Sequence, residues 1–159
     1  MYDELWSEIA DAPGEIFDYV ETKPMQDQQI ENVERYTVML CSALYESIKM
    51  QQLRWHQLAL EKGEDAKYHE NKIREIEDGG VDHEFYIEEG RKYLKIIHQF
   101  GARGSRSVNA FVNKKTGEVY KPATWQAPAK HVRYNLLDEK SREECYQRAD
   151  WAGGYLYIR

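Results

Sequence analysis

The sequence holds little cysteine and proline and has no long apolar run. Its two cysteines, Cys41 and Cys145, are far apart and fit neither a zinc nor a redox spacing. We therefore expect two buried free thiols and a reducing, cytoplasmic setting. No apolar stretch approaches the ~18 residues of a membrane span, and the acidic N-terminus lacks a signal-peptide pattern. The sequence thus predicts no segment that crosses a membrane.

Familiar catalytic and metal-binding motifs are also missing. Residues 101–104 contain two glycines but lack the Lys-Ser/Thr ending of a phosphate-binding loop. No serine lies in a nucleophile elbow, and the five histidines have no metal-ligand spacing. We predict no catalytic residue, no metal and no cofactor, which makes an enzyme the less favoured class.

Acidic and basic residues are distributed in blocks. Residues 1–90 contain 22 acidic and 8 basic residues, whereas residues 91–137 contain 10 basic residues and a single acid, Glu118. A basic block interleaved with aromatics is typical of a polyanion-binding surface. The acidic block would shield that surface, bind a basic partner or form solvated helix faces. Its densest parts, residues 3–21 and 75–89, could also mimic a phosphate backbone.

Residues 1–80 are predicted to form an acidic helical region. The apolar spacing predicts a short helix over 2–10. A second short helix should begin near residue 16 and end near Pro24, followed by a loop over 25–29. The chain therefore enters its main helix only after two interruptions.

The main helix is predicted over 30–62, because a helical period continues there with no glycine or proline before Gly63. Such a helix would be about 50 Å long, which exceeds the width of a small domain. Part of it should pack on residues 64–78, on the N-terminal helices or on a second copy in a homodimer. Its apolar or large positions are Val33, Thr37, Leu40, Leu44, Ile48, Gln51, Trp55 and Leu58.

Residues 81–159 are predicted to form a basic antiparallel meander. The segment 113–117 ends in Thr-Gly and indicates a tight hairpin. A helix over 138–151, capped by Asp138, should cover the sheet. The fold class is therefore α+β, with both regions in one compact unit. Strands are expected at residues 83–87, 93–100, 107–112, 118–121 and 155–158.

A candidate binding surface lies in the basic half. Cations neutralise phosphates and aromatic faces stack on unpaired bases, so this mixture suits single-stranded nucleic acid or a nucleotide. The loop over 121–135 is stiffened by Pro122 and Pro128 and presents a tryptophan beside cations. In the alternative interpretation, the tryptophan pins an ordered loop onto the sheet and the charges are incidental. The candidate residues are Lys95, Arg103, Arg106, Lys121, Trp125, Lys130, His131 and Arg133.

The segment over 105–137 resembles one that recurs in small proteins of tailed bacteriophages. A Ser-Val-x-x-Phe-Val strand leads to a Thr-Gly hairpin, followed by Tyr-Lys, a tryptophan, and Pro-Ala-Lys before an arginine. The resemblance implies a viral origin and carries no catalytic residues. The matching positions are Ser107, Val108, Phe111, Val112, Thr116, Gly117, Tyr120, Lys121, Trp125, Pro128, Ala129, Lys130 and Arg133.

Three functional hypotheses follow. The first is a phage accessory protein that binds a host protein in the host cytoplasm and inhibits a nucleic-acid-handling or defence system, as anti-CRISPR proteins do. The second is a nucleic-acid-binding module built on the basic aromatic half. The third is a small enzyme acting on phosphate esters or nucleotides, with His98 and His131 as an acid–base pair near Arg106 and Arg133.

Overall fold

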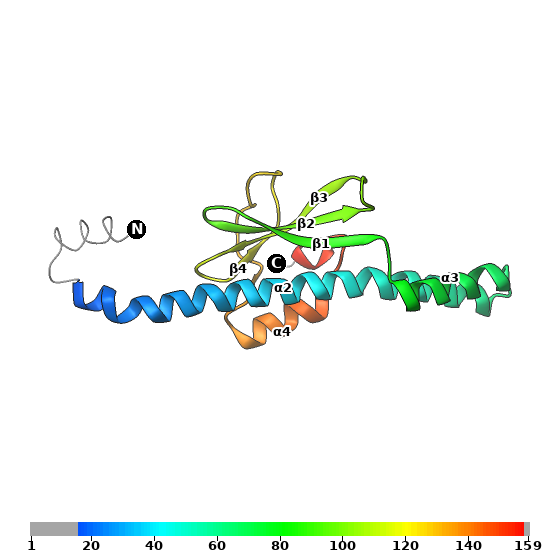
Figure 1. Cartoon of the computed structure of the whole chain (residues 1–159), viewed down its shortest axis with the longest axis horizontal. Helices are drawn as coiled ribbons and strands as arrows, with labels where there is room; N and C mark the ends of the chain where they lie inside the picture. Colours follow the sequence, from blue (N-terminus) through cyan, green and yellow to red (C-terminus); the bar gives the residue numbers. More distant parts are fainter. Residues whose placement is uncertain (1–15, 158–159) are drawn as a thin grey trace.

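One helix, α2 (Ile16–Glu61), runs along the base of the molecule (Figure 1). The computed structural model describes the backbone of residues 16–157 and the side chains of residues 23–157. At 46 residues, α2 is about 69 Å long. The helix predicted over 30–62 is confirmed, and the helix predicted over 2–10 lies outside the described residues.

The interruptions predicted near Pro24 and over 25–29 are wrong, because α2 continues through both. A proline inside a helix removes one backbone hydrogen bond but leaves those of its neighbours in place. Side-chain pairs four residues apart also bridge this stretch: Lys23 with Asp27 at 3.4 Å and Gln28 with Asn32 at 3.0 Å.

Helix α3 (Ala66–Gly79) folds back on the C-terminal end of α2 (Figure 1). The expected packing of the long helix on residues 64–78 is therefore confirmed. The turn between the helices contains Gly63, whose φ of 75° suits glycine. We call the two-helix projection made by α3 and residues 48–61 of α2 the arm.

The predicted apolar face of α2 is confirmed only as far as Ile48. Val33, Thr37, Leu40 and Leu44 are fully buried on that face. Beyond Ile48 the expected positions are wrong, since Gln51, Trp55 and Leu58 are exposed while His56 and Ala59 are buried. The buried face shifts because the sheet packs on one side of α2 and α3 on another.

The sheet is an antiparallel meander in the order β1-β2-β3-β4-β5. The hairpin glycine, Gly117, has a φ of 75° as its turn requires. Four of the expected strands are confirmed. The fifth, over 155–158, is wrong within the described residues, because a 3-10 helix, η1 (Gly154–Leu156), occupies that place. The strands are β1 (His83–Glu89), β2 (Tyr93–Phe100), β3 (Arg106–Asn113), β4 (Glu118–Tyr120) and β5 (Tyr134–Asn135).

Helix α4 (Glu139–Arg148) packs on α2 and β5. Its predicted cap is confirmed, since the Asp138 carboxylate accepts a hydrogen bond from the Ser141 N–H at 3.0 Å. One core joins the two halves of the chain. It includes both cysteines, which are buried and free as expected, and burial raises the pKa of each thiol to about 12. The α+β fold class is thus confirmed.

Candidate functional site

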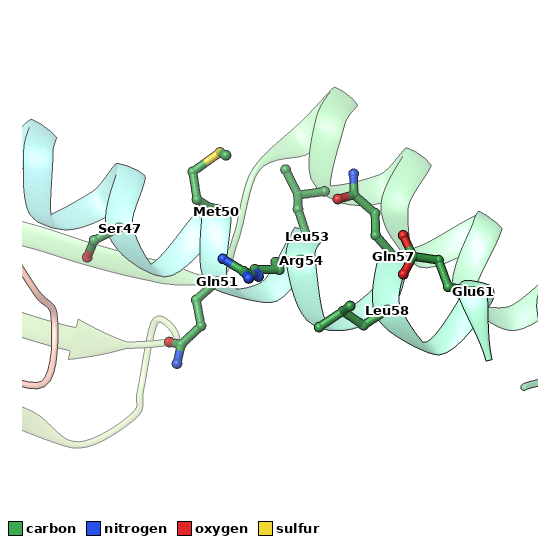
Figure 2. Close-up of a pocket in the computed structure, with 8 residues that line it drawn as sticks. All are labelled: Ser47, Met50, Gln51, Leu53, Arg54, Gln57, Leu58 and Glu61. Atoms are coloured by element: carbon green, nitrogen blue, oxygen red, sulfur yellow. The ribbon is translucent and has the colours of Figure 1, made fainter.

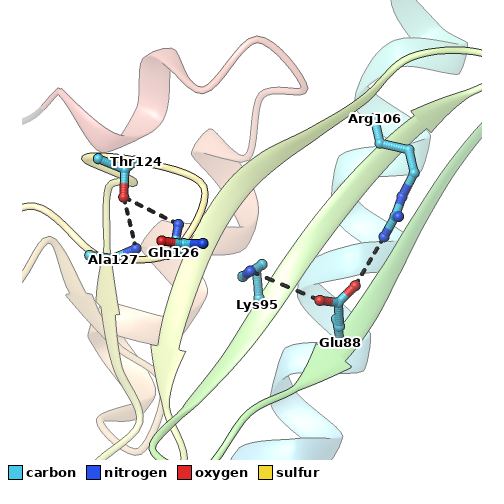
Figure 3. A network of polar contacts seen from close by, with 6 residues as sticks. All are labelled: Glu88, Lys95, Arg106, Thr124, Gln126 and Ala127. Carbon is cyan, nitrogen blue, oxygen red and sulfur yellow. Dashed lines mark hydrogen bonds and ion pairs between the residues drawn. The ribbon is translucent and has the colours of Figure 1, made fainter.

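The loop between β4 and β5 folds back on itself over the outer face of the sheet. Its base is closed by an isolated antiparallel bridge between Pro122 and Pro128. Near its tip, the Thr124 hydroxyl oxygen accepts hydrogen bonds from the N–H groups of Gln126 at 3.2 Å and Ala127 at 3.1 Å (Figure 3). The loop is therefore held in one shape from its base to its tip.

Trp125, at the tip of this loop, meets two cations from the sheet. Its ring centroid lies 4.9 Å from Lys95 Nζ and 5.4 Å from the guanidinium carbon of Arg106. Both distances suit a cation–π contact. Glu88 completes the group, with one oxygen 2.9 Å from Arg106 and the other 3.9 Å from Lys95 Nζ (Figure 3). We call these four residues the Trp125 cluster.

The register of the sheet explains how the cluster forms. Glu88 of β1 is directly opposite Lys95 of β2, and Arg106 of β3 pairs with Gln99 of β2 on the same face. Glu88 pairs with both cations but carries only one negative charge, so it holds the cluster together and leaves it net positive. Trp125 remains 40% exposed, which leaves part of its ring free to contact another molecule.

A cavity of about 220 Å³ opens next to the Trp125 cluster. Arg91, Lys92 and Tyr93 line it from the β1–β2 turn and the start of β2, and Gln126 lines it from the loop. Lys92 Nζ lies 5.4 Å from the Tyr93 ring centroid. Two exposed cations therefore stand beside the paired cations of the cluster, and sequence reasoning had not singled them out as site residues.

Arg133 serves the loop's own backbone. Its side chain donates hydrogen bonds to the carbonyl oxygens of Leu156 at 2.6 Å, His131 at 3.0 Å and Lys130 at 3.3 Å. His131 has a φ of 75°, which is uncommon for a residue other than glycine. The guanidinium thus holds a strained turn in place and is occupied by internal contacts.

The other predicted cations lie apart from the cluster. Lys121 Nζ is 4.3 Å from the ring centroid of Tyr157. Arg103 is exposed in the β2–β3 turn, and Lys130 and His131 are exposed near the end of the β4–β5 loop. The structure therefore brings together Lys95, Arg106 and Trp125 of the eight predicted residues and distributes the rest.

His98 pairs with His83, at 3.0 Å between ring nitrogens, and stacks on Phe85 with centroids 4.5 Å apart. Burial lowers the pKa of both histidines, and the neighbouring His83 lowers that of His98 further. Among the described residues, His98 and His131 share no hydrogen bond or ring contact. The acid–base pair expected from the sequence is therefore not assembled.

A second histidine pair lies inside the arm, joining α2 to α3. The Nδ1 atoms of His56 and His69 are 2.9 Å apart, and both side chains are buried. Trp55 and Tyr68 make edge contacts with the pair. No sequence pattern points to this pair, because its members belong to different helices.

The arm also carries a groove that sequence reasoning missed. The groove follows α2 from Ser47 to Glu61 and encloses about 660 Å³. In Figure 2, Met50 and Leu58 point to opposite sides of it, with Arg54 between them. The available signal was the pattern at Trp55 and Leu58, which had been assigned to a buried seam. We call this feature the arm groove.

The described residues form neither a membrane-spanning helix nor a metal-binding group. No helix there is both long and apolar enough to cross a membrane. In the same part of the chain, no three His, Cys, Asp or Glu side chains are grouped so that they could hold a metal ion.

Comparison with known proteins identifies one family. No curated protein and no solved structure matches the chain. The model of DUF7717, a family of unknown function, matches residues 16–158, which span the long helix, the arm, the sheet and α4. The match covers nearly the whole chain, and the protein therefore belongs to the DUF7717 family.

Proposed function

We propose that the protein acts by binding a partner protein through its arm. The observation that carries this proposal is the exposure of large apolar side chains there. Met50 and Trp55 are each 60% exposed, Tyr68 47% and Leu58 44%. Single exposed apolar residues are ordinary on a surface, but these four belong to one two-helix projection. Such a projection offers a partner apolar contacts without disturbing the core beneath the sheet.

The arm groove suits an amphipathic helix of the partner. It follows α2 for 15 residues, about 22 Å, which is about four helical turns. Helix-in-groove recognition uses apolar side chains on one face of the bound helix, and Met50 and Leu58 would receive them. Arg54, midway between these two, has no ion-pair partner among the described residues. We therefore expect the bound helix to place an acidic residue opposite Arg54.

We further propose that the partner is a host protein of a nucleic-acid-handling or defence system, which a phage accessory protein would inhibit in the host cytoplasm. The resemblance of residues 105–137 to phage segments supports this role. The excess of acidic residues over 1–90 supports it as well. A host protein that binds nucleic acid presents a basic surface, and an acidic region of this chain would be attracted to that surface.

Affinity capture with the full-length chain tests the arm. The bait is presented to an extract of the natural host cell as wild type, Leu58→Asp and Met39→Asp. Met39 is a matched control, since it is 48% exposed on the same helix but outside the arm groove. We expect one partner to be retained by wild type and Met39→Asp and lost by Leu58→Asp. Retention by all three baits, or by none, contradicts the proposal.

A second candidate function is binding of single-stranded nucleic acid. It is favoured by the assembly of Lys95, Arg106 and the exposed Trp125 ring beside Arg91 and Lys92. A fluorescent oligonucleotide titrated over a salt series tests it. Replacing both Arg91 and Lys92 by glutamine should reduce the salt slope by about two.

The matched control for that experiment is Lys67→Gln, which removes an exposed charge from α3. The control variant should keep the salt slope of the wild type. Absence of salt-sensitive binding at low ionic strength would exclude this second function and leave the arm proposal intact.

A further inference from the structure

Among the described residues, no strand pairs with the outer edge of β1. β1 is the first strand in the order β1-β2-β3-β4-β5, so it pairs on one side only. Backbone hydrogen bonds mark both ends of its pairing with β2. The Asp82 carbonyl accepts one from the Gly101 N–H, and the Gly90 N–H donates one to the Tyr93 carbonyl, each at 2.9 Å. Even-numbered residues therefore bond to β2, and odd-numbered ones direct their N–H and C=O groups away from it.

Of the usual kinds of edge protection, β1 has charged side chains, all of them glutamates, but not the others. Edge strands are commonly blocked by lysine, proline, a bulge or a covering segment. β1 (HEFYIEE) contains neither lysine nor proline, and its pairing with β2 runs from His83 to Glu89 without a bulge. No described residue hydrogen-bonds to the outward backbone groups of Phe85 and Ile87. An incoming strand would therefore find a regular ladder.

A groove runs beside the edge and would hold the side chains of such a strand. It encloses about 470 Å³ between α2 and β1, which lie next to each other in Figure 1. Val38, 51% exposed, and Cys41 line it from the helix, and Phe85 lines it from the strand. The groove is therefore apolar along its middle.

Its wall is also well anchored. The Tyr45 hydroxyl accepts a hydrogen bond from the Val81 N–H at 3.1 Å, just before β1 begins. A side chain on Gly80 would overlap that hydroxyl, so the linker and the tyrosine fit closely. The spacing between α2 and β1 is thus set by the fold before any partner arrives.

The charge at this edge selects the partner. Glu46 of α2 and Glu84 of β1 line the groove, and no lysine or arginine of the described part of the chain does. Glu89, at the end of β1, is 63% exposed at its side chain but is paired with Lys114 at 2.9 Å, so the selection of a basic partner rests on Glu46 and Glu84. A strand carrying lysine or arginine would meet opposite charge. Two copies of β1 paired in full antiparallel register would instead place Glu84 opposite Glu88 twice, which is unfavourable.

We propose that β1 binds an extended, basic segment of a partner protein as an added strand, with apolar side chains alternating into the groove. This surface is distinct from the arm groove and does not depend on what binds there.

A short peptide of alternating lysine and valine, titrated against the full-length protein, tests the inference, with an alternating glutamate–valine peptide as the matched control. Amide hydrogen exchange reports the site. We expect the basic peptide to bind and to slow exchange at Phe85 and Ile87, and the acidic peptide to do neither. Equal binding of the two peptides, or unchanged exchange at both amides, would overturn the proposal. So would protection of these amides in a peptide-free dimer.

Two variants at Ile87 isolate the backbone contribution. Ile87→Ala removes the side chain but keeps the outward N–H, whereas Ile87→Pro removes both. We expect Ile87→Pro to bind the basic peptide about tenfold more weakly than Ile87→Ala, since one hydrogen bond is lost. Equal affinity would count against strand addition.

Amide exchange at β2 and β3 shows whether Ile87→Pro folds. If it does not, the Glu84→Lys variant is used to test peptide binding at this edge. This variant should weaken binding of the basic peptide and strengthen binding of the acidic one. If the preference does not reverse, the charge at this edge does not select the partner.

Discussion

The two halves of α2 are buried to different degrees and by different kinds of residue. Beneath the sheet, Val33, Leu40 and Leu44 are fully buried in the main core. In the arm, the buried side chains of α2 include His56 and Ala59, while large apolar residues are exposed in both halves of the helix. The comparison indicates that α2 is stabilised by the body of the protein and leaves the arm available for recognition.

The largest effect is expected when a leucine is removed from the body, by which we mean the sheet, α4 and the part of α2 before residue 48. Leu44→Ala should lower the free energy of unfolding by about 3–5 kcal/mol, because it opens a cavity in a close-packed core. Leu58→Ala, in the arm groove, should change it by less than about 0.5 kcal/mol. Urea denaturation of both variants measures the contrast. Similar losses at the two sites would mean that the arm is packed as tightly as the body.

The junction between arm and body should be the next most sensitive place. Gly80 has a φ of 76° and a ψ of −160°, a conformation that belongs almost only to glycine. An added Cβ would also displace the Tyr45 hydroxyl from the Val81 N–H. Gly80→Ala should therefore lower the free energy of unfolding by about 2–3 kcal/mol.

Gly63, in the turn at the far end of the arm, is the matched control. Its φ of 75° is also positive, but no atom lies within 4 Å of the position an added Cβ would take. Gly63→Ala should lower the free energy of unfolding by only about 1 kcal/mol. Equal losses for the two glycines would show that Tyr45 adds nothing at the junction.

Local patterns were enough to predict β1 to β4 and the turn at 113–117, but not β5 or η1. The strand alternation and the turn at 113–117 depend on neighbouring residues, as does the cap at Asp138. The long helix was predicted, but with a break near Pro24 that the structure does not have. A proline destabilises a helix only locally, whereas contacts along the whole of α2 stabilise it. Trp55 was assigned to the buried face because its spacing suits either packing side, and only the position of α3 decides between them.

The candidate site was less accessible to sequence reasoning. Lys95 and Arg106 share a sheet face through register, which depends on how the β2–β3 turn closes. Trp125 reaches them only because the bridge between Pro122 and Pro128 closes the base of the loop that carries it. Glu88 lay outside the strand predicted over 83–87, so its role as counter-ion in the Trp125 cluster was missed. Each of these facts is a tertiary contact that no local pattern encodes.

The Trp125 cluster allows a smaller test, on the surface of the body. Trp125→Ala removes both cation–π contacts and should lower the free energy of unfolding by about 1 kcal/mol. Arg106→Gln removes one cation–π contact and a surface ion pair, and should lower it by less than about 1 kcal/mol. Urea denaturation checks both. A loss above about 3 kcal/mol for Trp125→Ala would place the loop in the core and not on the surface.

The smallest expected effect is a pH dependence of the arm. Burial lowers the pKa of His56, and the neighbouring His69 and Lys72 lower it further. The folded arm therefore binds protons less readily than the unfolded chain. Its stability should be complete above about pH 6.5, the ordinary histidine value, and should fall as the pH drops below it. Amide exchange at Ala59, corrected for the intrinsic rate, measures this opening.

The body has the same sign of pH dependence, because the pKa values of His83 and His98 are also lowered. A global unfolding curve would therefore mix the two regions, and variants must separate them. His56→Gln keeps a hydrogen-bonding side chain but cannot take up a proton, so it should abolish the acid sensitivity at Ala59 and preserve it in the body. His98→Gln should reduce the acid sensitivity of the body, where His83 remains, and leave that at Ala59 unchanged. If His56→Gln leaves the exchange at Ala59 as acid-sensitive as before, the histidine pair does not control the arm.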